Sequence, residues 1–348
     1  MRHHELTPVL DVSGLHVWFP RDPRSGAGES PLRAVENVSF TLYSGRTLGL
    51  IGESGCGKTL TAQALLQLIP APGRMRALRI ALHGDGDRDV VDVASLDPHG
   101  TAIRRVRGGQ IAMVFQDAAG SLSPVRTIGA QLREAIRLHR PLGRREADRV
   151  SAELLERVGL SDPHQRLREY AYQLSGGMSQ RVAIALALCG EPRVLIADEP
   201  TTALDPELQR QVVKLIGQLQ SVFDMAVLYV THDLGLIEEA CDEVAVMYLG
   251  RIVEQAPVQT LLTRPLHPYT KRLLESVPVL GRRRGRLPTV PGTVPRLLDI
   301  PPGCSFASRC EDVTQTCRGD VPALVEVAPR HRVRCYLHSS QREPGTED

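Results

Sequence analysis

The chain has 348 residues, 42% of them hydrophobic, and a formal net charge of +2. This length suits one large domain with an extension, or two domains. The near balance of charge disfavours a protein that wraps nucleic acid, because such a protein needs a clustered basic surface. No apolar run approaches the roughly 18 residues of a membrane-spanning helix, and the N-terminus lacks the apolar core of a signal peptide. We therefore expect a soluble, cytoplasmic chain that acts at a membrane only through other subunits.

In the first 250 residues, short β-rich runs alternate with helical patterns, which indicates an α/β fold. Residues 21–28 are expected to form a polar loop, and residues 74–109 irregular antiparallel ribbon and turns. A helical block from about residue 127 to residue 188 interrupts the alternation. The predicted strands span residues 10–17, 38–42, 47–51, 111–115, 194–197, 226–230 and 243–247.

After residue 254 proline becomes frequent, and a basic run follows at residues 282–286. We expect this run to be a solvated linker, because no aromatic residues interleave with it as in a nucleic-acid patch. The tail from about residue 338 is predicted to be disordered. Four of the seven cysteines crowd into this last part of the chain, and in a reducing cytosol such a group indicates a metal site rather than disulfides. They are Cys304, Cys310, Cys317 and Cys335.

Residues 52–59 match the phosphate-binding pattern GxxxxGK[ST], between an apolar run and a good helical segment at residues 60–66. Glycines let the backbone N–H groups of such a loop point at phosphate oxygens. Lys58 would reach the β- and γ-phosphates, and the Thr59 hydroxyl would bind Mg²⁺. The strand and helix on either side disfavour the alternative of an ordinary glycine-rich turn. The predicted ATP contacts here are Gly52, Ser54, Gly55, Cys56, Gly57, Lys58, Thr59 and Thr61.

The apolar run at residues 194–197 is followed by Asp198 and Glu199, at the end of a predicted strand where open α/β sheets bind ligands. Asp198 is predicted to hold Mg²⁺, and Glu199 to orient and polarise the attacking water. Alone this signal is weak. It is strengthened by the run Leu-Ser-Gly-Gly-Met-Ser-Gln-Arg at residues 174–181, which lies between the phosphate loop and this strand.

This order of motifs resembles the ATP-binding subunits of ABC transporters over residues from about 10 to 255. The resemblance implies a P-loop NTPase core with an antiparallel β subdomain and an α-helical subdomain at about residues 117–190, all within a domain of residues 1–255. It also implies a role for the serine and glycines of the run at 174–181, which in this family cap the γ-phosphate of ATP on the opposite subunit. The corresponding residues here are Ser175, Gly176 and Gly177, with Gln180 in the same signature.

Three further residues match the family's motifs. Gln116 corresponds to the Q-loop glutamine, which senses Mg²⁺ and contacts the membrane subunits. Asp205 belongs to the D-loop at residues 203–205, which crosses the dimer interface, and His232 corresponds to the switch histidine that hydrogen-bonds the γ-phosphate. An aromatic residue near the first strand stacks on adenine; the family's register favours Phe19 over Trp18, and the alternative is a core position for either.

Within this family the chain resembles the D-type subunits of dipeptide and oligopeptide importers. The resemblance rests on residues 52–58, 115–117 with 121–124, 196–205 and 267–270, and continues at 290–295, 303–306 and 309–310. It implies a small Pro- and Cys-rich C-terminal extension over residues 256–348. The chain departs from the family's pattern at Ser179, Tyr172 and residues 118–120, near the signature and the Q-loop. These departures bear on partner specificity more than on ATP binding.

The spacing of the four C-terminal cysteines differs from the CxxC pairs of common zinc ribbons. Thiolates suit iron–sulfur clusters as well as zinc. The resemblance implies a [4Fe-4S] cluster; a Zn²⁺ ion, or four structural cysteines without metal, are the alternatives. Cys56, inside the phosphate loop, is expected to react with thiol reagents when nucleotide is absent.

The resemblance implies an ATPase at the cytoplasmic face of the inner membrane, paired with a related F-type ATPase subunit beneath two permease subunits. ATP between the two ATPases would close the dimer, and hydrolysis would reset it. An extracytoplasmic substrate-binding protein would deliver short peptides, or alternatively nickel or another small solute. A soluble ABC-type ATPase of DNA or ribosomes is disfavoured because neither a long coiled-coil insertion nor a second cassette is seen. A non-hydrolysing regulator is disfavoured because Lys58, Asp198, Glu199 and His232 are all present.

Overall fold

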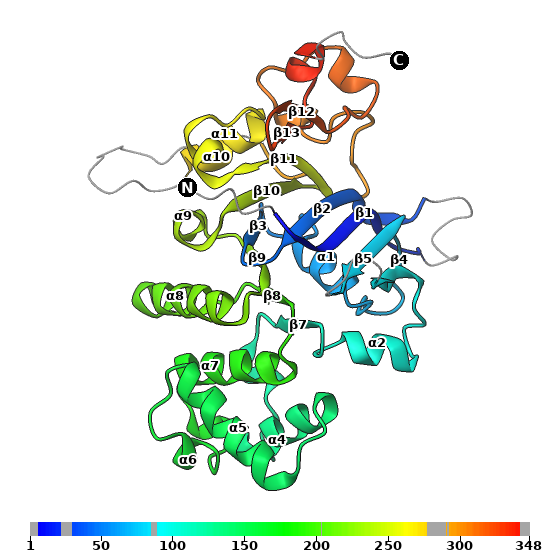
Figure 1. Cartoon of the computed structure of the whole chain (residues 1–348). Helices are drawn as coiled ribbons and strands as arrows, with labels where there is room; N and C mark the ends of the chain where they lie inside the picture. The colour runs from blue at the N-terminus through cyan, green and yellow to red at the C-terminus, as the bar shows by residue number, and fades with distance from the viewer. Residues whose placement is uncertain are drawn as a thin grey trace.

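The computed structural model describes residues 6–21, 30–84, 89–202, 204–276, 290 and 292–341. The basic run at 282–286, Ala203 and all but Arg21 of the predicted polar loop lie outside these residues. Figure 1 shows the C-terminal extension at one end, two sheets in the middle, and a group of helices at the other end. In the described part of the chain, every helix is too short or too polar to cross a membrane.

A mixed sheet forms the centre of the molecule, with the strand order β12-β13-β11-β10-β3-β9-β8-β7 in the described residues. The strands from β10 to β7 are parallel, and the others are antiparallel. Every residue of β3, β8 and β9 is buried, as expected for parallel strands covered on both faces. The bounds are β3 Thr47–Ile51, β7 Ile111–Val114, β8 Val194–Asp198, β9 Ala226–Thr231, β10 Glu243–Tyr248, β11 Arg251–Pro257, β12 Val325–Ala328 and β13 His331–Val333.

A second, antiparallel sheet packs beside the first, which confirms the expected antiparallel subdomain. Its two longest strands extend further than predicted. Positive φ angles at Gly14 and Asn37, with shifts in the β1–β2 register, mark irregularities that break the alternating pattern on which the prediction depended. A helix, α2 (Thr101–Val106), lies where turns were expected. The strands are β1 Pro8–Phe19, β2 Leu32–Tyr43, β4 Arg74–Arg76, β5 Arg79–His83 and β6 Val90–Asp92.

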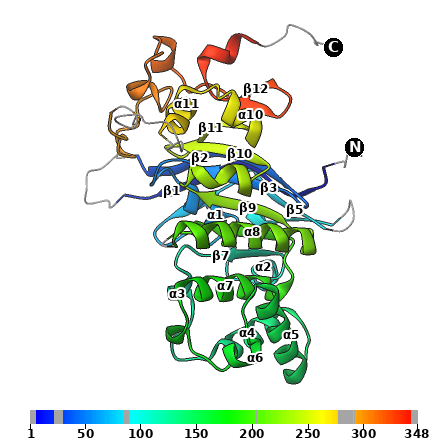
Figure 2. The same ribbon diagram turned by 90° about the vertical axis from the view of Figure 1, so that its left-hand side faces the viewer.

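The predicted helical block is a separate layer, which Figure 2 shows on the far side of α8 from β9. Buried apolar residues such as Leu132 and Ile136, four positions apart in α4, hold these helices together. The fold is therefore the expected α/β core with a helical subdomain. The remaining helices are α1 Lys58–Ala64, α3 Ala118–Ser121, α4 Ile128–His139, α5 Arg144–Arg157, α6 Pro163–Arg166, α7 Gly176–Ala187, α8 Pro206–Phe223, α9 Ile237–Ala240, α10 Val258–Thr263 and α11 Pro268–Glu275.

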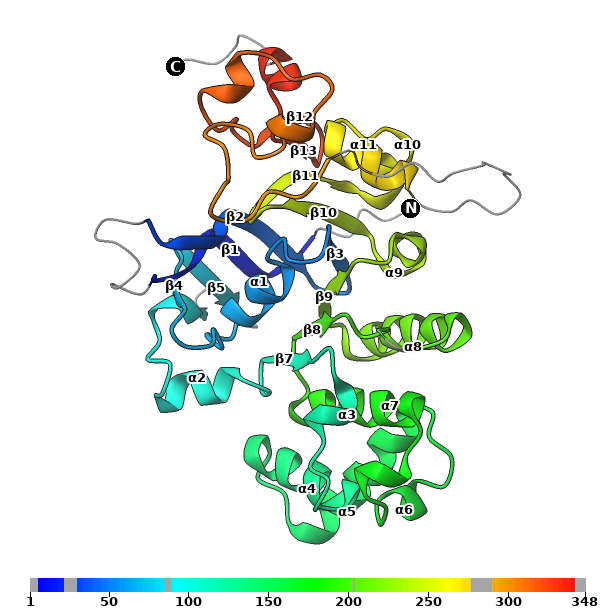
Figure 3. The same ribbon diagram turned by 180° about the vertical axis from the view of Figure 1, so that it is seen from behind.

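The C-terminal extension continues the central sheet rather than standing apart from it (Figure 3). β13 pairs with β11 through Glu254 opposite Val333, so the predicted boundary at residue 255 falls inside β11. A disordered tail was predicted from about residue 338, but residues 338–341 belong to a 3-10 helix, Tyr336–Gln341. Residues 342–348 lie outside the described part.

A fully buried carboxylate joins the extension to the core. Glu254 on β11 accepts hydrogen bonds from the backbone N–H groups of Leu266 and His267, at 2.8 and 2.9 Å, and from the His331 ring at 2.8 Å. His331 lies on β13, and Leu266 and His267 precede α11. One side chain therefore fixes the two ends of the extension to the same strand.

Candidate functional site

The loop between β3 and α1 adopts a conformation that requires glycine. Gly52 and Gly57 have φ angles of 152° and 105°, in the region that other residues rarely adopt. A Cβ atom at Gly52 would lie 2.2 Å from the Met247 carbonyl oxygen, and one at Gly57 2.5 Å from the Ala34 oxygen. The sequence pattern GxxxxGK[ST] therefore corresponds to real steric demands in this fold.

Lys58 lies inside this loop and is 5% exposed. Its Nζ donates hydrogen bonds to the carbonyl oxygens of Gly52 and Glu53, at 2.9 and 3.2 Å. Thr61 is fully buried, and its hydroxyl donates to the Gly57 carbonyl oxygen at 3.0 Å. The backbone carbonyl groups of the loop thus hold the Lys58 ammonium group within reach of a phosphate group that the loop would bind.

Cys56 is buried in the same loop, with 4% of its surface exposed. Burial raises the pKa of its thiol, although the Lys58 ammonium opposes this. A buried thiol with a raised pKa is a poor nucleophile. Burial therefore disfavours the expected reaction of Cys56 with thiol reagents in this conformation of the loop, and that reaction stays a prediction.

Asp198 ends β8 beside the loop and is 2% exposed. Its Oδ1 accepts a hydrogen bond from the Thr59 hydroxyl at 3.1 Å. Burial, with the nearby Glu199 charge, raises the pKa of Asp198 to about 6, against the opposing effects of Thr59 and Lys58. A buried carboxylate and a hydroxyl are hard oxygen ligands, and Mg²⁺ is commonly held by one or two such groups together with water and phosphate. These two residues therefore fit the predicted Mg²⁺ site.

Glu199 lies at the centre of a hydrogen-bonding group drawn from the three segments that follow β7, β8 and β9. Its Oε2 accepts from Gln116 Nε2 at 2.9 Å and from the Thr202 hydroxyl at 3.0 Å, and its Oε1 lies 3.0 Å from His232 Nδ1. Its own φ of 47° is unfavourable for a non-glycine residue, and such strain clusters at functional sites. The structure thus brings together the predicted Gln116, Glu199 and His232.

Thr202 is a site residue that the sequence motifs did not single out. It follows Glu199 by three residues in a turn, where the Thr202 backbone N–H also donates to the Glu199 carbonyl oxygen at 3.1 Å. A hydroxyl at this spacing after Asp-Glu is the only sequence signal, and it is weak because Ser and Thr form such turns generally.

The two aromatic candidates for adenine stacking face different surroundings. Trp18 lines a cavity of about 330 Å³, together with Arg33 and Val35 of β2. Phe19 packs against the apolar cluster below the sheet, where its ring approaches Gly73. It is not among the described residues that line the cavity. The role of Phe19 at adenine stays a prediction.

The residues of the signature lie away from this group, at the start of α7 in the helical subdomain (Figure 1). Ser175 and Gly176 are exposed, Gly177 is half-buried, and the Ser175 hydroxyl accepts a hydrogen bond from the Met178 N–H at 3.3 Å as the helix cap. Gln180 is buried. Among the described residues, no hydrogen bond or ion pair joins residues 175–177 to residues 52–59.

Asp205, predicted in the D-loop, caps the helix α8. Its Oδ1 accepts hydrogen bonds from the N–H groups of Glu207 and Leu208, both at 3.0 Å. This is the usual role of an aspartate at a helix N-terminus. A contact across a dimer interface stays a prediction.

The four C-terminal cysteines gather in one lobe of the extension. Cys304 donates its N–H to the Cys317 carbonyl oxygen at 2.9 Å. Burial, with a smaller effect of the nearby Cys304, Cys310 and Cys317, raises the pKa of Cys335 to about 11. In the part of the chain that the structure describes, however, no three His, Cys, Asp or Glu side chains are arranged to hold a metal ion. As they lie here, the thiols do not fit an iron–sulfur cluster or a zinc ion.

Comparisons with known proteins show the family to which the chain belongs. Residues 35–202 match the family described as ABC transporter, and residues 253–317 match the family described as oligopeptide/dipeptide transporter, C-terminal region. A probable peptide ABC transporter ATP-binding protein of Sinorhizobium fredii is 44% identical over 332 residues, 94% of each chain. A putative peptide import ATP-binding protein of Brucella melitensis is 45% identical over 335 residues, 94% of this chain and 96% of the relative.

Solved structures share the fold of the cassette. A dimeric ATP-binding cassette in a post-hydrolysis state, bound to ADP and Pi, aligns with a TM-score of 0.59 at 23% identity, over 72% of this chain and 98% of that chain. The cbiO1 protein of Clostridium perfringens, part of an ABC transporter complex, aligns with a TM-score of 0.57 at 25% identity, over 74% of this chain and 92% of that chain. The chain therefore belongs to the ATP-binding subunits of ABC transporters, in the group that carries the oligopeptide/dipeptide transporter C-terminal region.

Proposed function

We propose that this subunit hydrolyses ATP to drive the uptake of short peptides through partner permeases, at the cytoplasmic face of the inner membrane. The observation that carries the proposal is the Glu199 group: a carboxylate held by Gln116, Thr202 and His232, next to the Asp198–Thr59 pair. The peptide substrate is supported by the relatives, which are named as peptide import proteins.

In the proposed reaction, Lys58 and the loop amides would bind the β- and γ-phosphates, and Thr59 and Asp198 would hold the Mg²⁺ that neutralises phosphate charge. Glu199 orients and polarises the attacking water, since its carboxylate is an acceptor fixed by three donors. Gln116 and His232 hold that carboxylate and lie where they can respond to the γ-phosphate. Hydrolysis is thereby linked to the segments that follow β7 and β9.

The partner ATPase completes the site. Ser175, Gly176 and Gly177 are separated from the phosphate loop of their own chain, which supports a role at the ATP of a second, related F-type subunit. Asp205 lies at the start of α8, where it would face that interface.

A permease contact is supported by an apolar cavity of about 280 Å³ beside Gln116. It lies between the core and the helical subdomain and is lined by the half-exposed Phe115, with Leu66 on one side and Ala183 and Leu186 of α7 on the other. An apolar segment of a permease bound here would contact both the Q-loop at Gln116 and the helix α7, which begins with the signature. ATP-dependent motion of either element would then move the permease segment.

The test is transport by the assembled complex. The chain would be co-expressed with a second ATPase subunit, two permeases and an extracytoplasmic binding protein, and uptake of labelled dipeptides and tripeptides compared with uptake of nickel. Peptide uptake that is lost with Lys58→Ala supports the proposal. Uptake of nickel without uptake of peptides would show that the subunit serves a metal importer instead. ATP hydrolysis stimulated by DNA or ribosomes, without any permease, would refute it.

We also propose that Cys304, Cys310, Cys317 and Cys335 bind a [4Fe-4S] cluster. The proposal is supported by the gathering of the four thiols in one lobe of the extension, and it requires them to come closer than they lie in this structure. Anaerobically purified full-length protein should then be brown and contain iron and sulfide, and Cys→Ser at any of the four positions should reduce the colour. Stoichiometric zinc would replace the cluster with a zinc site, and four reactive thiols without metal would leave only a packing role.

A further inference from the structure

The phosphate loop is in direct contact with the C-terminal extension. Arg309 donates two hydrogen bonds to the Glu53 carboxylate, Nη1 to Oε2 at 2.8 Å and Nη2 to Oε1 at 3.1 Å. The two residues are 256 positions apart in the chain. The Arg309 side chain is 4% exposed, and the Glu53 side chain 26%. This is the two-pronged geometry in which arginine binds a carboxylate most firmly.

Glu53 connects this contact to the rest of the phosphate loop through its backbone hydrogen bonds. Its N–H donates to the Tyr269 hydroxyl of α11 at 3.0 Å. Its carbonyl oxygen accepts from Lys58 Nζ at 3.2 Å and from the Cys56 N–H at 3.3 Å. The extension therefore holds Glu53 by both its side chain and its backbone, while Glu53 in turn holds the lysine of the phosphate site.

Arg309 is itself firmly placed. Its guanidinium lies over the rings of Tyr248 and Phe306, 5.8 and 5.9 Å from their centroids, and donates to the Tyr248 hydroxyl at 3.3 Å. These two rings and Tyr269 pack together with centroids 4.6 to 5.4 Å apart. A side chain between packed aromatic rings has little freedom, so it can define where Glu53 lies.

We propose that Arg309 is a positioning residue for ATP binding, which holds Glu53 and thereby keeps the phosphate loop and Lys58 in place. A second effect follows from charge. Glu53 carries a negative charge beside a loop that binds the highly anionic nucleotide, and the guanidinium neutralises that charge. This inference goes beyond the proposed function, because it gives the extension a part in nucleotide binding whatever the transported solute is.

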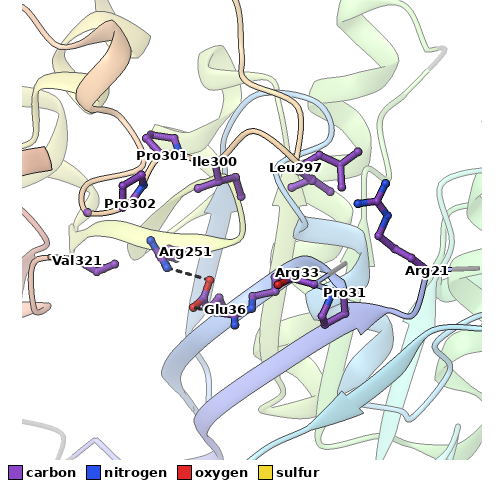
Figure 4. Close-up of a pocket in the computed structure, with 13 residues that line it drawn as sticks. Arg21, Pro31, Arg33, Glu36, Arg251, Leu297, Ile300, Pro301, Pro302 and Val321 are labelled. Atoms are coloured by element: carbon purple, nitrogen blue, oxygen red, sulfur yellow. Dashed lines mark hydrogen bonds and ion pairs between the residues drawn. The ribbon is translucent and has the colours of Figure 1, made fainter. Parts of the chain in front are cut away.

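A second ion pair offers a matched control (Figure 4). Arg251 pairs with Glu36 at 2.9 Å and donates to the Ser305 hydroxyl at 3.0 Å, and its side chain is 10% exposed. It lies beside a cavity of about 410 Å³ where the stretch from Leu297 to Gly303 passes over β2. Like Arg309 it joins the extension to the core, but its side chain is not bonded to the phosphate loop.

The experiment uses the full-length chain and measures two quantities: the Kd for a fluorescent ATP analogue with Mg²⁺, and the midpoint of thermal unfolding without nucleotide. Arg309→Ala should weaken ATP binding on the order of tenfold. Arg309→Lys should give an intermediate Kd, because lysine keeps the charge but not the paired geometry. Adding Glu53→Gln to Arg309→Ala should recover part of the affinity, because the unpaired carboxylate is removed. Arg251→Ala should lower the unfolding midpoint and leave the Kd unchanged.

Two results would overturn the proposal. One is an Arg309→Ala chain that binds the analogue as tightly as the unchanged chain. The other is an Arg251→Ala chain whose affinity falls as much, because the effect would then be a general loss of stability. If Arg309→Ala does not fold, Arg309→Lys decides the question: an unchanged Kd refutes the positioning role, and a weakened Kd with a nearly unchanged unfolding midpoint supports it.

Discussion

Two neighbouring carboxylates at the end of β8 have different surroundings. Asp198 is buried and accepts a hydrogen bond from the Thr59 hydroxyl, and its pKa is raised to about 6 mainly by burial. Glu199 is reached by Gln116, Thr202 and His232. Such a difference separates the roles of paired carboxylates in active sites. Here it supports the proposal that Asp198 binds the metal and that Glu199 orients the water.

The role of Glu199 predicts that Glu199→Gln still binds ATP but turns over about a hundredfold to ten-thousandfold more slowly in the assembled complex, which is the usual cost of losing a positioned base. Steady-state phosphate release and equilibrium ATP binding would be measured side by side. Thr202→Val is the companion variant: it removes one of the three donors and keeps the carboxylate, so its loss of turnover should be much smaller. Normal turnover by Glu199→Gln would refute the assignment.

The burial of Asp198 makes a prediction about pH. Its pKa is raised from 3.8 to about 6, so the folded chain keeps a proton that the unfolded chain has lost, and this carboxylate lowers stability as pH rises from about 4 to 6. Two pKa units correspond to about 3 kcal/mol. Asp198→Asn should therefore stabilise the nucleotide-free chain above pH 6, with a gain that fades toward pH 4.

Thermal unfolding across this pH range measures the effect. The exposed Asp299→Asn is a suitable control, since removing a surface charge usually changes stability by about 0.5 kcal/mol or less. If Asp198→Asn and the unchanged chain have the same stability at pH 7, the buried Asp198 carboxylate does not destabilise the nucleotide-free protein.

At the scale of elements, the sequence predicted the features that depend on residues close together in the chain. The phosphate loop and β8 were predicted because glycine patterns and apolar runs act within a few residues. The Arg309–Glu53 pair and the β11–β13 pairing join residues 256 and 79 positions apart, and no short pattern encodes them. The residues of β12 and β13 are few and partly exposed, so they carry little strand signal.

The joint between β11 and the extension predicts a large stability effect at Glu254. Glu254→Ala would leave two buried backbone N–H groups and the His331 ring without their acceptor. Each such group costs about 1–3 kcal/mol when unpaired, so the free energy of unfolding should fall by several kcal/mol. Glu326→Ala, on the exposed neighbouring strand β12, should cost far less. Urea unfolding of both variants tests this, and similar midpoints would contradict the proposed joint.

At the scale of the whole molecule, the proposed function gives each chain two half-sites, which lie in different parts of the fold. Lys58, Asp198 and Glu199 form one, in the segments that follow β3 and β8. Ser175 to Gly177 form the other, on the helical subdomain. A monomer should therefore bind ATP but hydrolyse it poorly, and strong hydrolysis by a demonstrably monomeric chain would contradict this arrangement.

The separation of the half-sites can be tested with two hydroxyl helix caps, Ser175 and Thr127, of the same subdomain. Ser175 caps α7 and Thr127 caps α4, each by accepting a backbone N–H at 3.3 Å, and both lie in the helical subdomain. Ser175→Ala and Thr127→Ala should each cost about 1 kcal/mol of stability, the usual loss of a cap. Neither should change ATP binding by the isolated chain. In the assembled complex, only Ser175→Ala should slow hydrolysis, because only Ser175 would contact the partner's nucleotide. Equal hydrolysis by the two variants would mean that this serine is a cap and nothing more, whereas weaker ATP binding by the isolated Ser175→Ala chain would place it in the site of its own subunit.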